Sequence, residues 1–553
     1  MNDRKSFLTC AVLLFFVSLL ILVIAWVKNT TTLTFPLDDA FIHAVYARNL
    51  VRGHFWEFNI GERATAETAP LWVFALSLPY TFGLSGFWAA LIVNGVLFVF
   101  LGIIIYRFAL FVVADRSLAL ITSMLVACTP PIVYAALSGM ETMLSVILVW
   151  SALVMFVSKK PDYALISSIL GVSVWARPDY GLLFVLFWLF AVPRNHKLKS
   201  LVGLISIAAF AMFHILLWGK PAPETFYAKV SDEGLIWALR TGNLREIFLS
   251  IFFYPVRSVV SALGAFYPYI PPMALFAIVG GYHIVRKNIK KMRQLILIAL
   301  LYIVIRGILI TPSAYQWGRY IAWVFPLMVF FAAVGLQEFR YRAITLSLAL
   351  ISLAAFFLWR LWAPWLSDAV LGGKIMMPGK NILFGWSYFP GLWSIVALAS
   401  FSAFLLALLR DKLLVLTGIL FIAMFLCVYG AGFSIALDMH KISGLQVSSA
   451  RWCGENLPAG TRILVHDIGA VGFYAPKLVV RDIWGILTSE ALVPEGGANP
   501  ILALKIPHKY FLTFECYDPK TLGVDSLYTP VKTWWVEYPT VGRDSSITLW
   551  QRR

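Results

Sequence analysis

Two adjacent carboxylates, Asp38 and Asp39, follow the first long apolar run of the chain in the stretch TTLTFPLDDAFIHAVYARNL. An aspartate at such a place can cap a helix, and DAFIHAVYARNLVRG has helical character, with Arg48 and Arg52 near its end and Gly53 as its stop. Alternatively, one aspartate can take a proton from a reacting hydroxyl while its neighbour orients that group. Both interpretations stay open here, because one aspartate can cap while the other does chemistry.

Four further polar clusters interrupt the apolar sequence: LSGMETM (137–143), ARPDY (176–180), PAPETFYAK (221–229) and SAYQWGRY (313–320). Their side chains could bind an anionic substrate through charges, amides and aromatic rings. The candidates for substrate binding are Glu141, Arg177, Asp179, Tyr227, Lys229, Gln316, Trp317 and Arg319.

Each cluster also has a purely structural interpretation. Glu141 suits the first turn of a helix, where it would favour the helix dipole. The two charges of ARPDY can form a local ion pair, and the Tyr and Lys of ETFYAK can anchor the chain at a membrane interface. Arg319 opens an apolar run and can snorkel from it. His43, His54 and His214 are not spaced as metal ligands, and we expect them to be structural.

The composition identifies the class of protein. Of 553 residues, 60% are hydrophobic, and the mean hydropathy is +0.81. The long apolar runs have about the 20 residues needed to cross a bilayer. The first run follows the basic start MNDRK and precedes no small-residue cleavage pattern, which predicts a retained span rather than a signal peptide. The chain is therefore expected to be a polytopic membrane protein.

We predict about 13 transmembrane helices, with the N-terminus inside. They lie near 7–28, 86–106, 117–137, 142–158, 162–176, 179–193, 200–218, 254–284, 294–311, 320–336, 343–362, 391–409 and 413–433. The proline-bearing run 70–84 is predicted to be a half-helix at the interface. The clustered Lys and Arg then fall in inner loops, as the positive-inside rule requires, and all five polar clusters fall on the outer face.

Net charge and cysteine content exclude two further classes. The net charge of +17 is scattered among the spans, so we expect no nucleic-acid partner. Five cysteines are too few for a disulfide scaffold, and no CxxC spacing for zinc occurs. Cys453 and Cys516 fall in the polar tail, where a disulfide between them is an open alternative.

The C-terminal segment differs from the rest of the chain. It contains strand-like runs RILVHD, LVVRDIWGI, KYFLTF and SITLW, a helix-like start VSSARWCGENLPAG and a glycine-bearing turn IGAVGFYAP. GAVGF is a weak nucleotide-loop pattern, and we set it aside because no nucleotide pool is expected outside. The sequence thus predicts a transmembrane domain over 1–433, with a first outer loop at 29–85 carrying interfacial helices, and a small extracytoplasmic α/β domain over 434–553.

A carboxylate pair beside Arg and Lys on the outer face suits glycosyl transfer from a lipid-phosphate sugar. One aspartate would take the proton of the acceptor hydroxyl as that hydroxyl attacks the anomeric carbon. The leaving polyprenyl phosphate would need a cationic partner.

The first outer loop, LDDAFIHAVYARNLVRGHFWEFNIGERATAETAPLW, resembles that of the GT-C glycosyltransferases. It is most similar to the arabinofuranosyltransferases that use decaprenyl-phosphate arabinose, where an Asp-Asp pair precedes a FNxGER…T.PLW pattern. SGMET, RPDY, ETFYAK and DIGAVGFYAPKLVVRDIWGI are similar in kind and order to that group. The resemblance covers most of the chain and is strongest at 35–72 and 137–143. The stretch ERATAET departs from the more aromatic run of these relatives, so the acceptor is not implied.

The resemblance implies an inverting transferase in a bacterial inner membrane, with its site and C-terminal domain on the extracytoplasmic side. Asp38 would be the general base, and Asp39 would orient the acceptor or help to bind a divalent cation (Mg, Mn or Ca), which some members of the superfamily use. The expected partners are a polyprenyl-phosphate sugar, membrane lipids and an envelope glycan, lipid or protein acceptor. Transfer of mannose, aminoarabinose or another sugar is the nearest alternative. A secondary transporter or a flippase for lipid-linked sugar is the alternative from another class.

Overall fold

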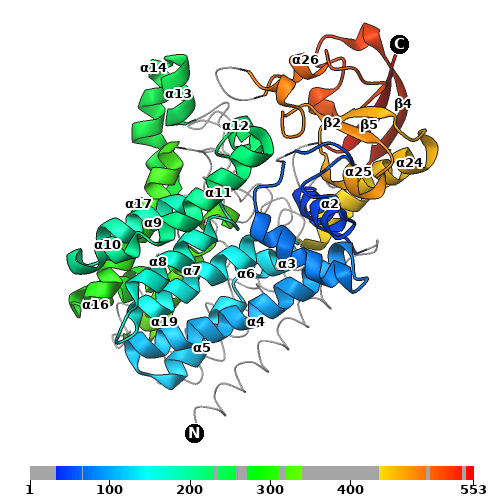
Figure 1. Cartoon of the computed structure of the whole chain (residues 1–553). Helices are drawn as coiled ribbons and strands as arrows, with labels where there is room; N and C mark the ends of the chain where they lie inside the picture. The colour runs from blue at the N-terminus through cyan, green and yellow to red at the C-terminus, as the bar shows by residue number, and fades with distance from the viewer. Residues whose placement is uncertain are drawn as a thin grey trace.

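The computed structural model describes residues 33–64, 66–229, 234–256, 258–259, 271–309, 318–338, 435–493, 498–537 and 544–553. A body of packed helices carries a small α/β domain, coloured orange to red in Figure 1, which contains the C-terminus. The predicted spans at 7–28, 343–362, 391–409 and 413–433 lie outside the described residues, as do Gln316 and Trp317.

The helices of the body follow most of the predicted apolar runs. Their bounds are α3 Pro70–Thr81, α4 Gly86–Val113, α5 Arg116–Ala127, α6 Pro130–Leu137, α7 Thr142–Val157, α8 Tyr163–Ser173, α9 Tyr180–Phe190, α10 Lys197–Ser200, α11 Gly203–Trp218, α12 Glu224–Lys229, α13 Leu235–Thr241, α14 Leu244–Phe248, α16 Pro271–Arg286, α17 Lys290–Leu309 and α19 Val324–Glu338. Within the described residues, three helical stretches are long and apolar enough to cross a membrane, or four with one bent pair. Thirteen spans therefore stay a prediction.

One predicted span differs from the structure. The run 117–137 forms α5 and α6, which meet at a bend of 57°. Pro130 and Pro131 follow the bend, and because proline has no N–H and clashes with the preceding turn, the helix cannot continue through them. Of the run 254–284, residues 257 and 260–270 lie outside the described residues, and α16 begins at Pro271.

The first outer loop forms a buried helix, α2 (Asp39–Val51), at the predicted place. It is apolar on most of its surface, because α3 packs on it from the body and α25 (Gly469–Tyr474) packs on it from the C-terminal domain. Figure 1 shows α2 next to α25 at the junction of the two parts. Since Asp39 begins this helix, its packing decides where the carboxylate pair lies.

The C-terminal domain is a mixed five-stranded sheet of order β2-β1-β3-β5-β4. Its strands are β1 Arg462–Val465, β2 Val479–Asp482, β3 Tyr510–Phe514, β4 Tyr528–Trp535 and β5 Ser546–Arg552, with α24 Ser448–Asn456 and α26 Pro500–Ala503 beside them. β1 runs parallel to β2 and β3, whereas β5 is antiparallel to β3 and β4. The predicted strands are confirmed, and the edge strand β4 was missed because it contains Pro530, which is tolerated only at an edge or bulge.

The thiols of the tail are not paired with each other. Cys453 is buried and free, and Cys516 is an exposed free thiol that contacts Asp544. The disulfide between Cys453 and Cys516 is therefore wrong. The tail is held by packing instead, because one continuous apolar cluster runs from the helical body into the domain. Phe41 of α2, for example, contacts the rings of Phe473 and Tyr474.

Candidate active site

The Asp38 carboxylate holds the C-terminal domain. Its two oxygens accept hydrogen bonds from the backbone N–H groups of Gly469 (2.7 Å) and Ala470 (2.8 Å), at the start of α25. Asp38 stands at the N-cap position of its own helix α2 but makes no capping hydrogen bond there, so that interpretation is wrong. Burial and the nearby carboxylate of Asp467 raise the pKa of Asp38, which the two amides only partly offset.

Asp39 faces the other way, toward the helical body. Its Oδ2 lies 3.1 Å from Nη2 of Arg319, and 43% of its side chain is exposed. Arg319 begins the short 3₁₀ turn Arg319–Ile321, directly after Gly318. Gly318 has a φ of +70°, and a Cβ there would meet the Phe325 ring at 2.6 Å, so this turn requires glycine. The ion pair contradicts snorkelling of Arg319 into the interface.

Arg319 is a buried cation whose hydrogen-bonding capacity is only partly used. Its side chain is 8% exposed, and Nη2 bonds to Asp39 and to the Tyr320 hydroxyl. Within the described residues, Nε and Nη1 have no partner. Unpaired N–H groups of a buried guanidinium are costly, and an anion with two oxygens would satisfy them.

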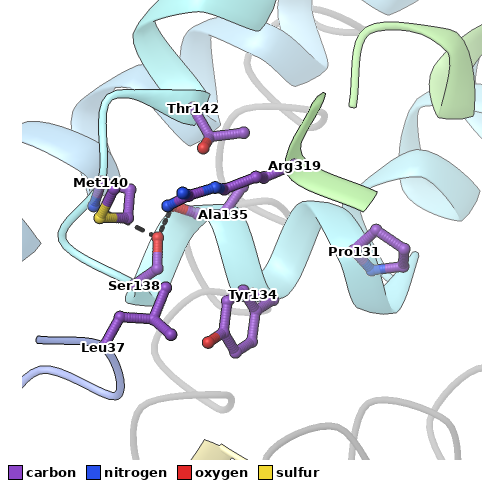
Figure 2. Close-up of a pocket in the computed structure, with 8 residues that line it drawn as sticks. All are labelled: Leu37, Pro131, Tyr134, Ala135, Ser138, Met140, Thr142 and Arg319. Atoms are coloured by element: carbon purple, nitrogen blue, oxygen red, sulfur yellow. Dashed lines mark hydrogen bonds between the residues drawn. The ribbon is translucent and has the colours of Figure 1, made fainter. Parts of the chain in front are cut away.

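A hollow lies against Arg319, as Figure 2 shows. Its lining is mostly apolar. The lining residues are Leu37, Pro131, Tyr134, Ala135, Ser138, Met140, Thr142 and Arg319. They come from the first outer loop, from α6 and from the SGMET turn, so the bend before α6 helps to form this hollow. A cation at the edge of an apolar hollow suits an anion with an apolar tail.

A chain of buried ion pairs links two of the predicted clusters, LSGMETM and ARPDY, and continues to Arg306 of α17. Arg177 Nη1 lies 2.6 Å from Glu141 Oε1, and Arg177 Nε lies 3.1 Å from Asp179 Oδ1. The local pair within ARPDY is thus confirmed, but it extends further, because Arg306 Nε lies 3.3 Å from Asp179 Oδ2. Glu141 is committed to this network and makes no cap at the start of α7.

His43 completes the network on the side of α2. Its Nδ1 lies 2.6 Å from Glu67 Oε2, and its Nε2 lies 3.2 Å from Glu141 Oε2. Burial lowers the pKa of His43, but the two carboxylates outweigh burial and raise it to about 10. Burial likewise opposes the charge of Glu141, but its contacts with His43 and Arg177 bring its pKa well below the ordinary value. His43 is therefore charged at neutral pH.

The ring of Tyr320 contacts the guanidinium groups of three arginines. The guanidinium carbons of Arg306, Arg177 and Arg319 lie 4.1, 4.6 and 5.0 Å from its centroid. The face of an aromatic ring attracts cations, so Tyr320 reduces the mutual repulsion of three positive charges in one place. The carboxylate pair thus lies at the edge of a concentrated cationic region.

Of the remaining predicted residues, the structure describes the side chain of Tyr227, which lies outside this network. Tyr227 contacts the Trp218 ring at 5.6 Å and the Lys220 ammonium at 5.0 Å. Lys229 ends α12, and its side chain lies outside the described part of the chain. Substrate binding by these two residues stays a prediction, as it does for Gln316 and Trp317.

The donor set fits a divalent cation poorly. Both carboxylate oxygens of Asp38 already accept backbone N–H groups, and Asp39 is paired with an arginine. In the described ranges, no three His, Cys, Asp or Glu side chains are grouped as metal ligands. We therefore derive no step through a metal at Asp38 and Asp39.

Several site residues could not be recognised in the sequence. Glu67, Arg306 and Tyr302 carry no motif of their own, and His43 was expected to be only structural. The Tyr302 hydroxyl donates to Asp179 Oδ2 at 3.1 Å, from within α17. The one available signal was Arg306, an arginine within an apolar run, because charges in such runs are rare and usually functional.

The comparisons agree with this architecture. Residues 438–550 match a family described as a domain of unknown function (DUF8728). No curated protein matches the chain.

Solved structures similar to the chain include ArnT from Cupriavidus metallidurans bound to undecaprenyl phosphate (15% identity, TM-score 0.58, 98% of this chain and 97% of that one). Another is the oligosaccharyltransferase of Archaeoglobus fulgidus in the apo form (12% identity, TM-score 0.53, 99% of this chain and 76% of that one). These likenesses show the fold: the chain shares the fold of these two proteins over almost its whole length.

Proposed function

We propose that this chain is an inverting glycosyltransferase. It would move a single sugar from a polyprenyl-phosphate donor to a cell-envelope acceptor on the outer face of a bacterial inner membrane. The observation that carries the proposal is Arg319, a buried guanidinium that pairs with Asp39 through one nitrogen and leaves two others beside an apolar hollow. A structure of similar fold was solved with undecaprenyl phosphate bound, which supports a lipid phosphate as a ligand of this chain.

In this mechanism Arg319 takes the phosphate of the donor. Its Nε–H and Nη1–H groups can each donate to an anionic oxygen, and the lipid tail would begin against the apolar lining of the hollow. As the bond between the anomeric carbon and the phosphate oxygen breaks, negative charge grows on the phosphate. A preorganised cation at that point stabilises the transition state more than the ground state.

We propose Asp39 as the general base, in place of the initial assignment to Asp38. The acceptor oxygen forms the new bond to the anomeric carbon, its proton passes to an Asp39 oxygen, and the leaving phosphate keeps the electron pair of the broken bond. Asp39 is half exposed and can meet an acceptor, whereas both oxygens of Asp38 are committed to backbone amides. Asp38 would then position its neighbour rather than accept the proton.

The donor sugar is proposed from the sequence resemblance alone. Arabinofuranose is the first choice because the first outer loop resembles that of arabinofuranosyltransferases. Mannose and aminoarabinose fit the geometry as well, since nothing in the site described so far touches the sugar ring.

Donor turnover in lipid nanodiscs tests this function. Purified protein is given radiolabelled polyprenyl-phosphate arabinofuranose, mannose and aminoarabinose in turn, and transfer and acceptor-free sugar release are both counted. We expect one donor to turn over, and Arg319→Gln to slow that turnover by about a hundredfold or more, as for other lost transition-state contacts. Arg240→Gln, which removes an exposed arginine of α13, is the matched control.

Wild-type rates in Arg319→Gln would contradict the phosphate site. Turnover of no donor by the wild type would overturn the transferase and favour a transporter or flippase.

A further inference from the structure

A group of polar and aromatic side chains lies at the carboxyl ends of the parallel strands of the C-terminal domain. After β1, the chain leads through α25 to β2 on one side, and β3 then pairs with β1 on the other side. The carboxyl end of β1 is therefore the point where the connections diverge, and open α/β sheets bind ligands in that place. His466 and Asp467 directly follow β1 there.

The polar side chains at this point are incompletely satisfied. His466 Nδ1 lies 2.8 Å from Asp467 Oδ1, and Gln446 Nε2 donates to Asp467 Oδ2 at 3.1 Å. Gln446 is only 5% exposed, yet its Oε1 has no partner within the described residues. The side chains of His466 and Asp467 are 18% and 27% exposed, so a ligand can reach them. A buried amide oxygen without a donor indicates a missing hydroxyl or N–H group.

Aromatic rings surround the imidazole. The Trp484, Phe514 and Tyr517 rings lie 5.3, 4.9 and 5.3 Å from the His466 ring. Trp484 is held in place because the buried carboxylate of Asp482 accepts its backbone N–H, along with those of Ile486 and Leu487. Aromatic rings next to side chains that can form hydrogen bonds suit a sugar ring, which has apolar C–H faces and hydroxyl groups.

The carboxylates around His466 make this point unsuitable for an anionic ligand. Among the described residues, Asp38, Asp438, Asp467 and Asp544 act electrostatically on this point or on each other, and the ammonium of Lys441 opposes them. A phosphate would be repelled by this excess of carboxylates, whereas a neutral polyol can donate hydrogen bonds to them. The lipid-phosphate donor is therefore not the ligand for this place.

The contacts also place this point beside the carboxylate pair. Asp38 bonds to Gly469 and Ala470, two and three residues after Asp467, while Asp39 bonds to Arg319 on the other side. The pair thus lies between the cationic region of the body and the carboxyl edge of the sheet. An acceptor bound at that edge would approach the proposed base from the side opposite the donor phosphate.

We propose that the carboxyl edge of this sheet, formed by Gln446, His466, Asp467, Trp484 and Tyr517, binds a neutral sugar ring of the acceptor. Its assignment to the acceptor rests on the proposed transferase function, whereas its binding of a neutral sugar does not. The C-terminal domain would then supply acceptor recognition, and the helical body would supply the donor site and the base.

Saccharide binding by the full-length protein in nanodiscs, without donor, tests the inference. The probes are methyl glycosides of arabinofuranose, mannose and galactose and the α-linked disaccharides of each, measured by saturation-transfer NMR. We expect Trp484→Ala and His466→Phe to weaken binding by about tenfold, the loss expected for one contact to a ligand. His466→Phe keeps a ring among the aromatic side chains, so it carries the test if Trp484→Ala fails to fold. Trp535→Ala, at an exposed site on β4, is the control and should bind like the wild type.

Kinetics separates this inference from the transferase itself. In the transfer assay, both variants should raise the acceptor KM and leave acceptor-free donor hydrolysis unchanged. If both variants lose saccharide binding but neither they nor the wild type transfer sugar, the result would support the saccharide site and contradict the transferase. Wild-type binding in both variants, or no binding of any probe by the wild type, would overturn the inference.

Discussion

At the scale of single residues, Asp38 and Asp39 are neighbours in sequence with opposite surroundings. Asp38 is buried against backbone amides of the C-terminal domain, and Asp39 is half exposed beside Arg319. A carboxylate held by two amides contributes mainly to stability, while an exposed one near a cation can exchange a proton with a substrate. The two aspartates should therefore respond differently to the same substitution.

We expect Asp39→Asn to reduce turnover by about a hundredfold to ten-thousandfold, because it removes a base, with little change in stability. Asp38→Asn should instead destabilise the protein by about 1–3 kcal/mol, because the amide NH₂ would face a backbone donor. Turnover of the polyprenyl-phosphate donor and thermal unfolding in detergent, measured on both variants, check this. Greater loss of turnover in a stable Asp38→Asn would return the role of base to Asp38.

His43 makes a second prediction at this scale, on pH. Its pKa rises from an ordinary 6.5 to about 10 in the fold, because Glu67 and Glu141 favour the charged form. The folded state then binds the proton more tightly, so this stabilisation is complete below pH 6.5 and is lost as pH rises through about 10. We expect the melting temperature in detergent to fall over that range, and His43→Gln to flatten the fall. His54→Gln, at a partly exposed histidine, is the control; equal slopes in all three proteins would exclude His43 as the cause.

At the scale of elements, the contact between α2 and α25 joins the two parts of the site. Asp38 accepts the first amides of α25, and Arg48 donates to the carbonyls of Phe473 (2.8 Å) and Gly472 (3.0 Å) at its end. Opposite charges at the two ends of a helix match its dipole. This explains the sequence GAVGF, because the glycines admit the close approach of the first outer loop rather than a nucleotide.

Substitution of these glycines should weaken the contact between α2 and α25. A Cβ on Gly469 would clash with the Asp38 carbonyl oxygen, and one on Gly472 would clash with the Phe58 ring. We expect Gly469→Ala to lower the melting temperature and to make the C-terminal domain easier to cleave by protease. Gly181→Ala is the control, because a Cβ there would meet nothing within 4 Å. An unchanged cleavage rate in Gly469→Ala would contradict the close packing.

At the scale of the whole molecule, the first outer loop attaches the C-terminal domain at a second place. Asn59 pairs with the backbone of Val480 through both its amide oxygen and its amide nitrogen, at 2.9 and 3.0 Å. Arg481 forms a bidentate pair with Glu62 at 2.6 and 2.7 Å. The loop thus extends the β2 edge of the sheet and connects it to the helices, which places the carboxylate pair between the two parts.

Reversal of the Glu62–Arg481 pair tests this docking. We expect Glu62→Arg alone to lower stability by about 0.2–1 kcal/mol, since the pair is partly exposed and solvent weakens it. The double variant Glu62→Arg with Arg481→Glu should recover most of the loss. Melting temperatures of the four proteins of this cycle give the coupling. A coupling of zero would show that Asn59 and α25 hold the domain without this pair.

The sequence by itself determined the features that depend on local pattern. Apolar runs marked the helices α4, α7, α9 and α17, and alternation marked β1, β2, β3 and β5, because hydrophobic burial and backbone periodicity act over a few residues. The same local pattern identified charged residues that interrupt the apolar sequence, namely Asp38, Asp39, Glu141, Arg177, Asp179 and Arg319. The likeness of the first outer loop to GT-C enzymes added an expectation of architecture, and the chain shares its fold with ArnT and the oligosaccharyltransferase.

Only the tertiary structure showed which partner each of these residues contacts, and therefore which role each can have. Asp38 meets Gly469 across 431 residues, and Arg319 meets Asp39 across 280. Such pairings depend on how whole elements pack, which no local pattern records. For the same reason His43 and Glu67 carried no signal in the sequence, and only the close packing of α25 on α2 explains the glycines of GAVGF. The roles proposed for the two aspartates follow from that packing.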